Sequence, residues 1–552
     1  MTVAAEAARK PNPFERLFDA LVDPKRCERT MLWVLAGYVG AWSVYGAIAK
    51  SSQDLHFDIG EMFAWSHQVG WSAPTHPPLG AWLTRAWFAF MPRQDWAFYL
   101  FAILIATVAL WIAWRLAGRY LPPDKRVLGI ALLSLLPFYN FHALKFNASS
   151  VLTPFWAATT WWFLVSFESR RAGFAVLAGL AAGTAMLGKY WSLFLLAGLG
   201  LAVLTDPRRG AYFHSAAPWL TIAAGALVLA PHLYFIATHG FATVDFAFTS
   251  HATTRAHAAA GALYFMLSVV GYIAAPIVVG ALATWPKDWS AKEWPKAAAI
   301  KDTLWPATPE RRTIVVAFAA PLVLAALAGI ISRADLDPLW TISAMTLLPV
   351  VLLSSPLVTV NRKAAVYVLV LAVAVPLVMV VASPVIALVI HRRGVTNYAG
   401  QYRLIAQAVE QVWRAQTDRP LRILGGNRPV VDGSNFYFAD PPATFVVTEP
   451  ARTPWVDQAR IEREGIAIVC PRLDPPCMKE LDRYAAGSGS KITDVTLARL
   501  FFGITDTPID YRIAIVPPRS ASFVPAKAGT QCTKSFSLDS RVRRTERQNQ
   551  YR

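Results

Sequence analysis

Residues 54–82 read DLHFDIGEMFAWSHQVGWSAPTHPPLGAW, and this polar stretch follows the first long apolar run of the chain, residues 31–49. A membrane protein emerges into water at such a point. Asp58 and Glu61 are three residues apart, so a helix would place both carboxylates on one face. Carboxylates beside hydrocarbon are costly unless they are paired or hydrated. The stretch therefore predicts either a solvated acidic loop or a functional site on the first external segment, residues 51–93.

The composition of the 552-residue chain is that of a membrane protein. Hydrophobic residues make up 55% of the chain and charged residues only 16%, whereas about 25% is usual for a soluble globular protein. The formal net charge is +18. Lys and Arg in cytoplasmic loops explain this excess, so we expect contact with membrane lipids and no nucleic-acid partner.

Apolar runs of near membrane-spanning length recur along the chain. Basic loops alternate with them, which places the basic residues 1–30 in the cytoplasm and the segment 51–93 outside. The sequence predicts an all-α polytopic domain over residues 31–390. Its about eleven spans are 31–49, 95–117, 127–144, 150–167, 172–188, 191–205, 216–237, 261–284, 313–331, 338–357 and 364–390.

The C-terminal region differs in kind from the membrane domain. Residues 397–518 contain short strand-like runs bounded by Gly and Pro, together with two helical runs, so they predict a small extracytoplasmic α/β domain. Cys470 and Cys477 lie close together in CPRLDPPC and are a disulfide candidate if this domain is outside the cytoplasm. A zinc site is disfavoured because no second Cys or His pair accompanies them. Residues 519–552 lack apolar periodicity, so we expect them to be disordered.

Asp58 is the first candidate for chemistry. A carboxylate within hydrogen-bond reach can act as the base for a hydroxyl group that attacks an electrophile. Glu61 is interpreted as positioning the acceptor, raising the pKa of Asp58 by like-charge repulsion, or sharing a metal ion with it. Two carboxylates suit Mg²⁺ or Mn²⁺. The cofactor prediction is therefore none, or one of these cations at Asp58 and Glu61.

His76 precedes Pro77-Pro78, and proline restricts the backbone of the residue before it. Its imidazole is interpreted either as a phosphate contact or proton donor, or as an ordinary interfacial histidine. Lys145 and Lys189 each end a span on the external side, where the positive-inside rule disfavours cations. They predict contacts to a lipid phosphate, with snorkelling to the interface as the alternative.

Four further residues complete the candidate sites. Tyr190 follows Lys189 and is grouped with it at the phosphate. His142 and Asn147 flank Lys145 in NFHALKFNASS and are assigned to an acceptor or sugar pocket. Arg255, in the loop 239–260, is a further phosphate candidate, although most of that loop reads as solvated. No Walker A or dinucleotide-binding motif is visible, so direct use of a nucleotide is not supported.

Three stretches resemble the GT-C superfamily of integral-membrane glycosyltransferases, and in particular the bacterial family 39 proteins. That group contains protein O-mannosyltransferases, lipid A aminoarabinose transferases and lipid A galacturonosyltransferases. The resemblance covers about residues 50–240. The stretches are FDIGEMFAWSHQVGW…THPPLGAW, KFNASSVLTPFWAATTWWFL and AGLAAGTAMLGKYWSLFLLAGLGL.

The resemblance implies a GT-C fold, a polyprenyl-phosphate sugar donor and an essential Asp, which matches Asp58. Many relatives have Glu directly after this Asp, whereas this chain has Ile59, which puts a two-carboxylate role in doubt. His76 occupies the position where relatives carry a Lys or His before the proline, and inherits a contact to the lipid phosphate.

The expected function is sugar transfer in the bacterial inner membrane, with the active site facing the periplasm. The acceptor would be a hydroxyl or phosphate of lipid A or its core, of another envelope lipid or glycan, or of a protein. The rival interpretation is a transporter or flippase of a lipid-linked or small polar solute. Transporters place ionisable groups near the bilayer midplane in repeated halves. The external acidic cluster, in a chain without a clear two-half repeat, favours the transferase.

Overall fold

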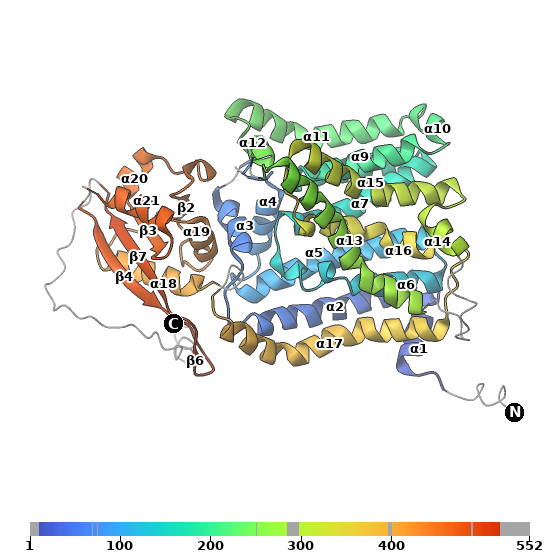
Figure 1. The fold of residues 1–552 in the computed structure, drawn as a ribbon, viewed down its shortest axis with the longest axis horizontal. Coiled ribbons are helices and arrows are strands. Elements are labelled where there is room, and N and C mark those ends of the chain that lie inside the picture. Colours follow the sequence, from blue (N-terminus) through green and yellow to red (C-terminus); the bar gives the residue numbers. More distant parts are fainter. Residues whose placement is uncertain are drawn as a thin grey trace, which may run out of the picture. The chain divides into compact units, whose positions relative to one another are not determined.

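The computed structural model describes residues 10–68, 70–73, 75–249, 251–283, 297–395, 400–486 and 489–518 (Figure 1). The predicted disordered tail, 519–552, and the first nine residues of the predicted N-terminal region lie outside them. The chain forms two compact units. The first unit comprises Met1–Tyr45, Trp71–Gly80 and Phe98–Val381, and the second comprises Gly46–Gly70, Ala81–Ala97 and Ala382–Arg552.

Long apolar helices confirm a multi-span membrane protein. Among the described residues, six helices are long and apolar enough to cross a bilayer. They are α2 (Cys27–Ala49), α5 (Asp95–Tyr120), α11 (Ala217–His239), α13 (Arg255–Ala283), α15 (Pro309–Ser332) and α17 (Arg362–Arg392). Other helices over predicted spans are α6 (Pro123–Ser134), α7 (Ala148–Ser169), α8 (Ala172–Gly188), α9 (Ser192–Leu204) and α16 (Leu348–Leu353).

Two predicted spans are helical only in part. The run 127–144 holds the end of α6, and Pro137 then begins the 3-10 turn η2 (Pro137–Tyr139), followed by η3 (Ala143–Lys145). Proline cannot donate the backbone hydrogen bond that would continue α6. The run 338–357 begins as the 3-10 helix η5 (Pro338–Leu347) before α16.

Short helices complete the membrane part of the chain. They are α1 (Pro13–Val22), α3 (Phe57–Gln68), α4 (Leu79–Phe88), α10 (Arg209–Phe213), α12 (Ala242–Thr249) and α14 (Ala297–Leu304). The predicted first external segment thus contains α3 and α4. The amphipathic helix α1 is held at its N-terminus by Asn12, whose side chain accepts from the backbone N–H of Glu15 in a reciprocal capping box.

Small residues allow the helices of the first unit to pack closely. A Cβ on Gly179 of α8 would lie 2.2 Å from the backbone oxygen of Thr221 on α11. A Cβ on Gly198 of α9 would lie 2.5 Å from the ring of Pro321 on α15. Inside a membrane the hydrophobic effect does not drive helices together, so close van der Waals packing at such positions stabilises the bundle.

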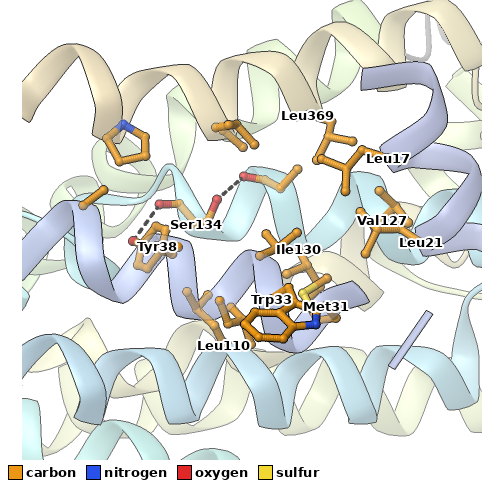
Figure 2. Close-up of a pocket in the computed structure, with 18 of the residues that line it drawn as sticks. Leu17, Leu21, Met31, Trp33, Tyr38, Leu110, Val127, Ile130, Ser134 and Leu369 are labelled. Atoms are coloured by element: carbon orange, nitrogen blue, oxygen red, sulfur yellow. Dashed lines mark hydrogen bonds between the residues drawn. The ribbon is translucent and has the colours of Figure 1, made fainter. Parts of the chain in front are cut away.

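An apolar cavity of about 230 Å³ lies among α1, α2, α5, α6 and α17 (Figure 2). Leu17 and Leu21 of α1 close one end of it, and Leu369 lines it from α17. The Tyr38 phenol O–H donates to the backbone oxygen of Tyr139 at 2.8 Å, and its oxygen lies 3.3 Å from that of Ser134. The described residues that line this cavity include no Asp, Glu, Lys, Arg or His, and their apolar side chains offer space to an apolar group.

The second unit contains the predicted α/β domain, built on a five-stranded sheet of order β2-β1-β3-β7-β4. The strands β1 (Ile423–Gly426), β2 (Ala443–Val446) and β3 (Ile466–Pro471) are parallel. β7 (Ile509–Val516) runs antiparallel to both β3 and β4 (Lys491–Leu497). The remaining elements are α18 (Tyr402–Arg414), α19 (Arg428–Asn435), η6 (Pro450–Arg452), α20 (Gln458–Glu464), α21 (Pro475–Ala485), β5 (Leu500–Phe501) and β6 (Ile504–Thr505).

Helices cover both faces of this sheet because alternate strand residues point to opposite sides. Leu424 packs with Val409 and Trp413 of α18 in one core. Its neighbour Ile423 packs with Ile461 of α20 and Leu481 of α21 in the other. The parallel strands β1, β2 and β3 are buried on both faces, as is typical of parallel sheets between helical layers, whereas the edge strand β4 is largely exposed.

Cys470 of β3 and Cys477 of α21 form the expected disulfide. The bond joins residues seven apart in sequence. A disulfide that closes a loop of this length stabilises the folded protein by about 2 kcal/mol, because it restricts the unfolded chain. Replacing both cysteines by Ala should therefore lower the melting temperature of the α/β domain by several degrees. Thermal unfolding monitored by intrinsic fluorescence measures this change. The control is Cys27→Ala, at a buried free cysteine of α2. Equal melting of the double variant and the wild type would contradict a stabilising role for the bond.

Candidate functional site

Asp58 lies in the first turn of α3. The side chain is 18% exposed, and its Oδ2 lies 3.7 Å from Nδ1 of the buried His56. The Asp58 backbone N–H donates to the same imidazole nitrogen at 3.1 Å. The positive end of the helix dipole favours a carboxylate in this turn. The structure therefore holds Asp58 at a helix start with part of its surface accessible.

Glu61 lies one turn later on α3, is buried, and faces the C-terminal domain. Its Oε1 accepts a hydrogen bond from Nε of Arg428 at 2.9 Å and lies 2.7 Å from Nη2 of the same guanidinium. Asp432, also buried, lies 3.7 Å from Nε of the same guanidinium. Burial raises the pKa of Glu61, and the nearby Asp58 charge adds to this while Arg428 opposes it.

Burial also raises the pKa of Asp432 well above its ordinary value, and the charge of Glu61 acts in the same direction. One guanidinium therefore faces two buried carboxylates. Like charges in such proximity cannot both ionise without a large cost. Burial and like-charge repulsion thus raise the pKa of both carboxyls, and the positive charge of Arg428 opposes this for each of them.

In the first unit, the ammonium group of Lys189 lies at the N-terminal end of α7. Its Nζ donates to Oγ of Ser149 at 3.2 Å, and Ser149 lies in the first turn of that helix. Asn147 is the N-cap, and its side-chain oxygen accepts from the backbone N–H groups of Ser149 and Ser150. A helix N-terminus attracts anions through its free N–H groups and its dipole. The lysine adds a full positive charge at the same place.

Tyr190, the residue after Lys189, is held in place by a hydrogen bond to His232. Its hydroxyl lies 2.7 Å from Nε2 of His232, and Nδ1 of that imidazole lies 2.7 Å from the backbone oxygen of Trp71. A backbone carbonyl can only accept, so His232 carries its proton on Nδ1 and accepts at Nε2 from the tyrosine O–H. Tyr190 thus connects the turn that carries Lys189 to α11 and to the segment before α4.

Two aromatic groups that the spacing of the sequence did not indicate complete the surroundings of Lys189. Its Nζ lies 4.3 Å from the centroid of the Trp340 ring, a cation–π distance. The His251 ring lies 4.8 Å from that of Trp340. Burial lowers the pKa of His251, and the positive charge of Lys189 contributes to this. The backbone bond from Asp335 N–H to the oxygen of His251, at 2.8 Å, keeps the two segments together.

The remaining predicted residues of the first unit are placed as follows. Lys145 ends η3, and its backbone N–H donates to the oxygen of His142. The His142 ring lies 5.7 Å from that of Tyr272. His76 is partly buried, with its ring 6.1 Å from that of Phe246. Arg255 begins α13 and is exposed.

The predicted residues fall into both units. Asp58 and Glu61 belong to the second unit, and the seven other candidates outside the disulfide belong to the first. Asn147 uses its side chain as a helix cap. The Glu61 carboxylate forms an ion pair with Arg428. In the part of the chain that the structure describes, no group of three or more His, Cys, Asp or Glu side chains is arranged to hold a metal ion.

Comparison with known proteins identifies related glycosyltransferases. The model of the family described as dolichyl-phosphate-mannose-protein mannosyltransferase matches residues 75–235. Lipid A galacturonosyltransferase RgtD of Rhizobium johnstonii is 25% identical to the chain over 219 residues. That match covers 39% of this chain and 45% of RgtD, so the chain matches less than half the length of this relative.

Two crystal structures of ArnT from Cupriavidus metallidurans share the fold. The structure bound to undecaprenyl phosphate has a TM-score of 0.57 at 15% identity, over 87% of this chain and 98% of ArnT. The apo structure has a TM-score of 0.55 at 14% identity, over 87% of this chain and 97% of ArnT. These comparisons confirm the predicted resemblance to GT-C glycosyltransferases and the GT-C fold.

Proposed function

We propose that the chain is an integral-membrane glycosyltransferase of the bacterial inner membrane, which moves a sugar from a polyprenyl-phosphate donor to an envelope acceptor on the periplasmic face. The observation that carries the proposal is the position of Lys189 at the N-terminus of α7. Lys189 and helix α7 both lie within residues 75–235, which the mannosyltransferase family model matches. The bound undecaprenyl phosphate named for the ArnT structure supports a donor of the same class.

The donor phosphate would lie against the Lys189 ammonium group and the positive end of the α7 dipole, next to the Asn147 cap that holds the N–H groups of Ser149 and Ser150. When the glycosidic bond to phosphate breaks, negative charge develops on the phosphate oxygen that leaves. Positive groups held in place before the reaction stabilise that charge without reorganisation. Further contacts to the phosphate, in its bound position or on its way there, are proposed for Lys145, His76 and Arg255. Positions next to the sugar are proposed for His142 and Asn147.

Asp58 would act on the acceptor. A hydroxyl oxygen of the acceptor forms a bond to the anomeric carbon of the sugar, and the bond from that carbon to the phosphate oxygen breaks. The hydroxyl proton passes to the Asp58 carboxylate, which is 18% exposed at the start of α3. Glycosidic transfer is then complete, with polyprenyl phosphate as the second product.

A lipid is the acceptor that the comparisons favour. RgtD is described as acting on lipid A, and the disulfide between Cys470 and Cys477 fits an oxidising compartment outside the cytoplasm. We propose lipid A, its core, or a related envelope lipid as the acceptor class, and leave the identity of the sugar to the experiment.

The donor class can be tested by binding. The purified full-length protein, in lipid nanodiscs, is titrated with undecaprenyl phosphate and with undecaprenol, which lacks only the phosphate group. The proposal predicts saturable binding of undecaprenyl phosphate and much weaker binding of undecaprenol. Equal binding of both lipids would show that the site does not recognise the phosphate and would overturn the proposed donor.

We further propose that the reaction needs no divalent cation at Asp58 and Glu61. Arg428 already forms an ion pair with Glu61 Oε1 and donates a hydrogen bond to it from Nε, so an ion shared by the two carboxylates would compete with a guanidinium. Transfer should therefore change by less than about twofold after treatment with EDTA. A large loss that Mg²⁺ or Mn²⁺ restores, measured on the same enzyme preparation, would show that one of these cations binds there.

A further inference from the structure

A hydrogen bond between two polar side chains, Asn427 and Asp474, joins the segments that follow β1 and β3. The strand order β2-β1-β3 creates between β1 and β3 the kind of crevice in which α/β domains usually bind ligands. Here Asn427, directly after β1, donates from Nδ2 to Oδ2 of Asp474 at 2.7 Å. The two side chains are the N-caps of α19 and α21. Their contact joins the starts of both helices and gives α19 a fixed origin.

The next residue along the chain, Arg428, is the first residue of α19 and contacts α3. Besides its ion pair with Glu61, its guanidinium lies 5.5 Å from the centroid of the Phe57 ring, at the start of α3. The backbones of the two helices also meet. A Cβ on Gly60 would lie 2.2 Å from the backbone oxygen of Asp432, so only glycine permits this approach. Helix α19 therefore packs directly on the first turn of α3, where Asp58 lies.

A second set of contacts fixes the segment that enters α3. Asp54 is buried and accepts hydrogen bonds from the Arg499 guanidinium at 2.5 Å and from the backbone N–H of Arg403 at 2.8 Å. The backbone N–H of Leu55 donates to the Tyr437 hydroxyl at 2.8 Å. These three partners all come from the C-terminal part of the chain. The segment before Asp58 and the turn after it are thus both bound to the α/β domain.

Removal of the Arg428 charge would leave two buried carboxylates, Glu61 and Asp432, without their main counter-charge, and the smaller effect of Arg452 alone would oppose their repulsion. Breaking a buried ion pair by deleting one partner is strongly destabilising, because the remaining charge is neither solvated nor compensated. Glu61 would then have to bind a proton or move towards water. Since Asp58 lies three residues before Glu61 on the same short helix, either response alters the position or charge environment of Asp58.

We infer that the C-terminal α/β domain acts as a positioning module for the segment that carries Asp58, and that Arg428 is a positioning residue that acts on Asp58 through Glu61. This role deepens the proposed function and rests on it for its catalytic consequence. The structural part of the inference, the restraint of α3 by α19, stands on contacts within the second unit alone.

Hydrogen exchange of the full-length protein tests the restraint without any activity. In Arg428→Ala, amides of residues 57–68 should exchange at least about tenfold faster than in the wild type, because α3 loses its buried ion pair. The matched control is Arg422→Ala, which removes an Arg of the same domain from an exposed ion pair with Asp440. Unchanged protection of α3 in Arg428→Ala would overturn the inference.

Kinetics test the consequence for the reaction. Arg428→Ala and Glu61→Gln should each lower kcat at least about tenfold while leaving the affinity for undecaprenyl phosphate unchanged, since Lys189 and α7 belong to the other unit. The double variant should lose no more than either single variant, because both changes break one interaction. Arg422→Ala should retain wild-type kcat. A general loss of folding would instead lower lipid affinity together with kcat.

The outcomes separate the two proposals. Wild-type kcat in Arg428→Ala would overturn the positioning role, whatever the wild-type enzyme transfers. Additive losses in the double variant would also overturn it, since Arg428 would then act independently of Glu61. Faster exchange of α3 in a protein that transfers no sugar would uphold the restraint by the α/β domain and reject the proposed function.

Discussion

Asp58→Asn is expected to reduce sugar transfer by at least about a hundredfold, the lower end of what a general base contributes. Asparagine keeps the shape of the side chain and cannot take up the acceptor proton. Folding should survive, because the side chain is partly exposed and a carboxylate at a helix start contributes only about 0.3–1 kcal/mol. The measurement is turnover of purified protein, with affinity for undecaprenyl phosphate as the check on folding.

Asp124→Asn is the matched control for this variant. Asp124 also lies in the first turn of a helix, α6, so its replacement removes the same kind of helix-end stabilisation without touching α3. It should retain wild-type turnover. Wild-type turnover in Asp58→Asn would remove Asp58 from the mechanism and with it the proposed role of the first external segment.

Lys189→Met should weaken the binding of undecaprenyl phosphate by about tenfold to a hundredfold, since a hydrogen bond to a charged group contributes about 1.5–3 kcal/mol. Methionine keeps an unbranched apolar side chain and removes the ammonium group that lies over the Trp340 ring. Transfer should fall at least as much, because the charge of the departing phosphate grows as the sugar leaves. Titration in nanodiscs measures the first effect and turnover the second.

Lys301→Met controls for the loss of a positive charge. Lys301 is exposed in the last turn of α14, so its replacement should change neither affinity nor turnover. Lys189→Arg should recover part of the affinity, since the charge returns in a different shape. Equal affinity of Lys189→Met and the wild type would place the phosphate elsewhere in the protein.

The sequence was sufficient for features that depend on local composition. Apolar length identified the long helices, and the spacing in CPRLDPPC led to the disulfide that the structure contains. The alternation of short strand-like and helical runs after residue 397 led to the α/β domain. The interruptions in two spans were harder to predict from the sequence, because apolar content alone does not show that Pro137 begins a 3-10 turn or that η5 is a 3-10 helix.

Long-range partners were beyond the reach of sequence spacing. The i,i+3 relation between Asp58 and Glu61 suggested a shared role, whereas Glu61 is bound by Arg428, 367 residues away in the chain. Trp340 reaches Lys189 from a segment with no motif of its own. Only tertiary packing brings such groups together.

Two local signals in the sequence allow sharper predictions. Asn147 precedes Ala-Ser-Ser and a long apolar helix, a typical N-cap position, and the structure uses it as one. Gly179 and Gly183 are four residues apart in α8, the small-residue spacing at which membrane helices approach each other. The structure has α11 against both glycines.

The most direct test of sugar transfer is mass spectrometry of envelope lipids from the native cells with the gene intact, deleted, or carrying Asp58→Asn. We expect one lipid to lose the mass of a single glycosyl group in the deletion and equally in Asp58→Asn, and we expect Asp124→Asn to leave the lipid unchanged. That mass would also identify the class of sugar. Identical lipid glycosylation in all strains, with the protein present in the membrane, would contradict sugar transfer to an envelope lipid.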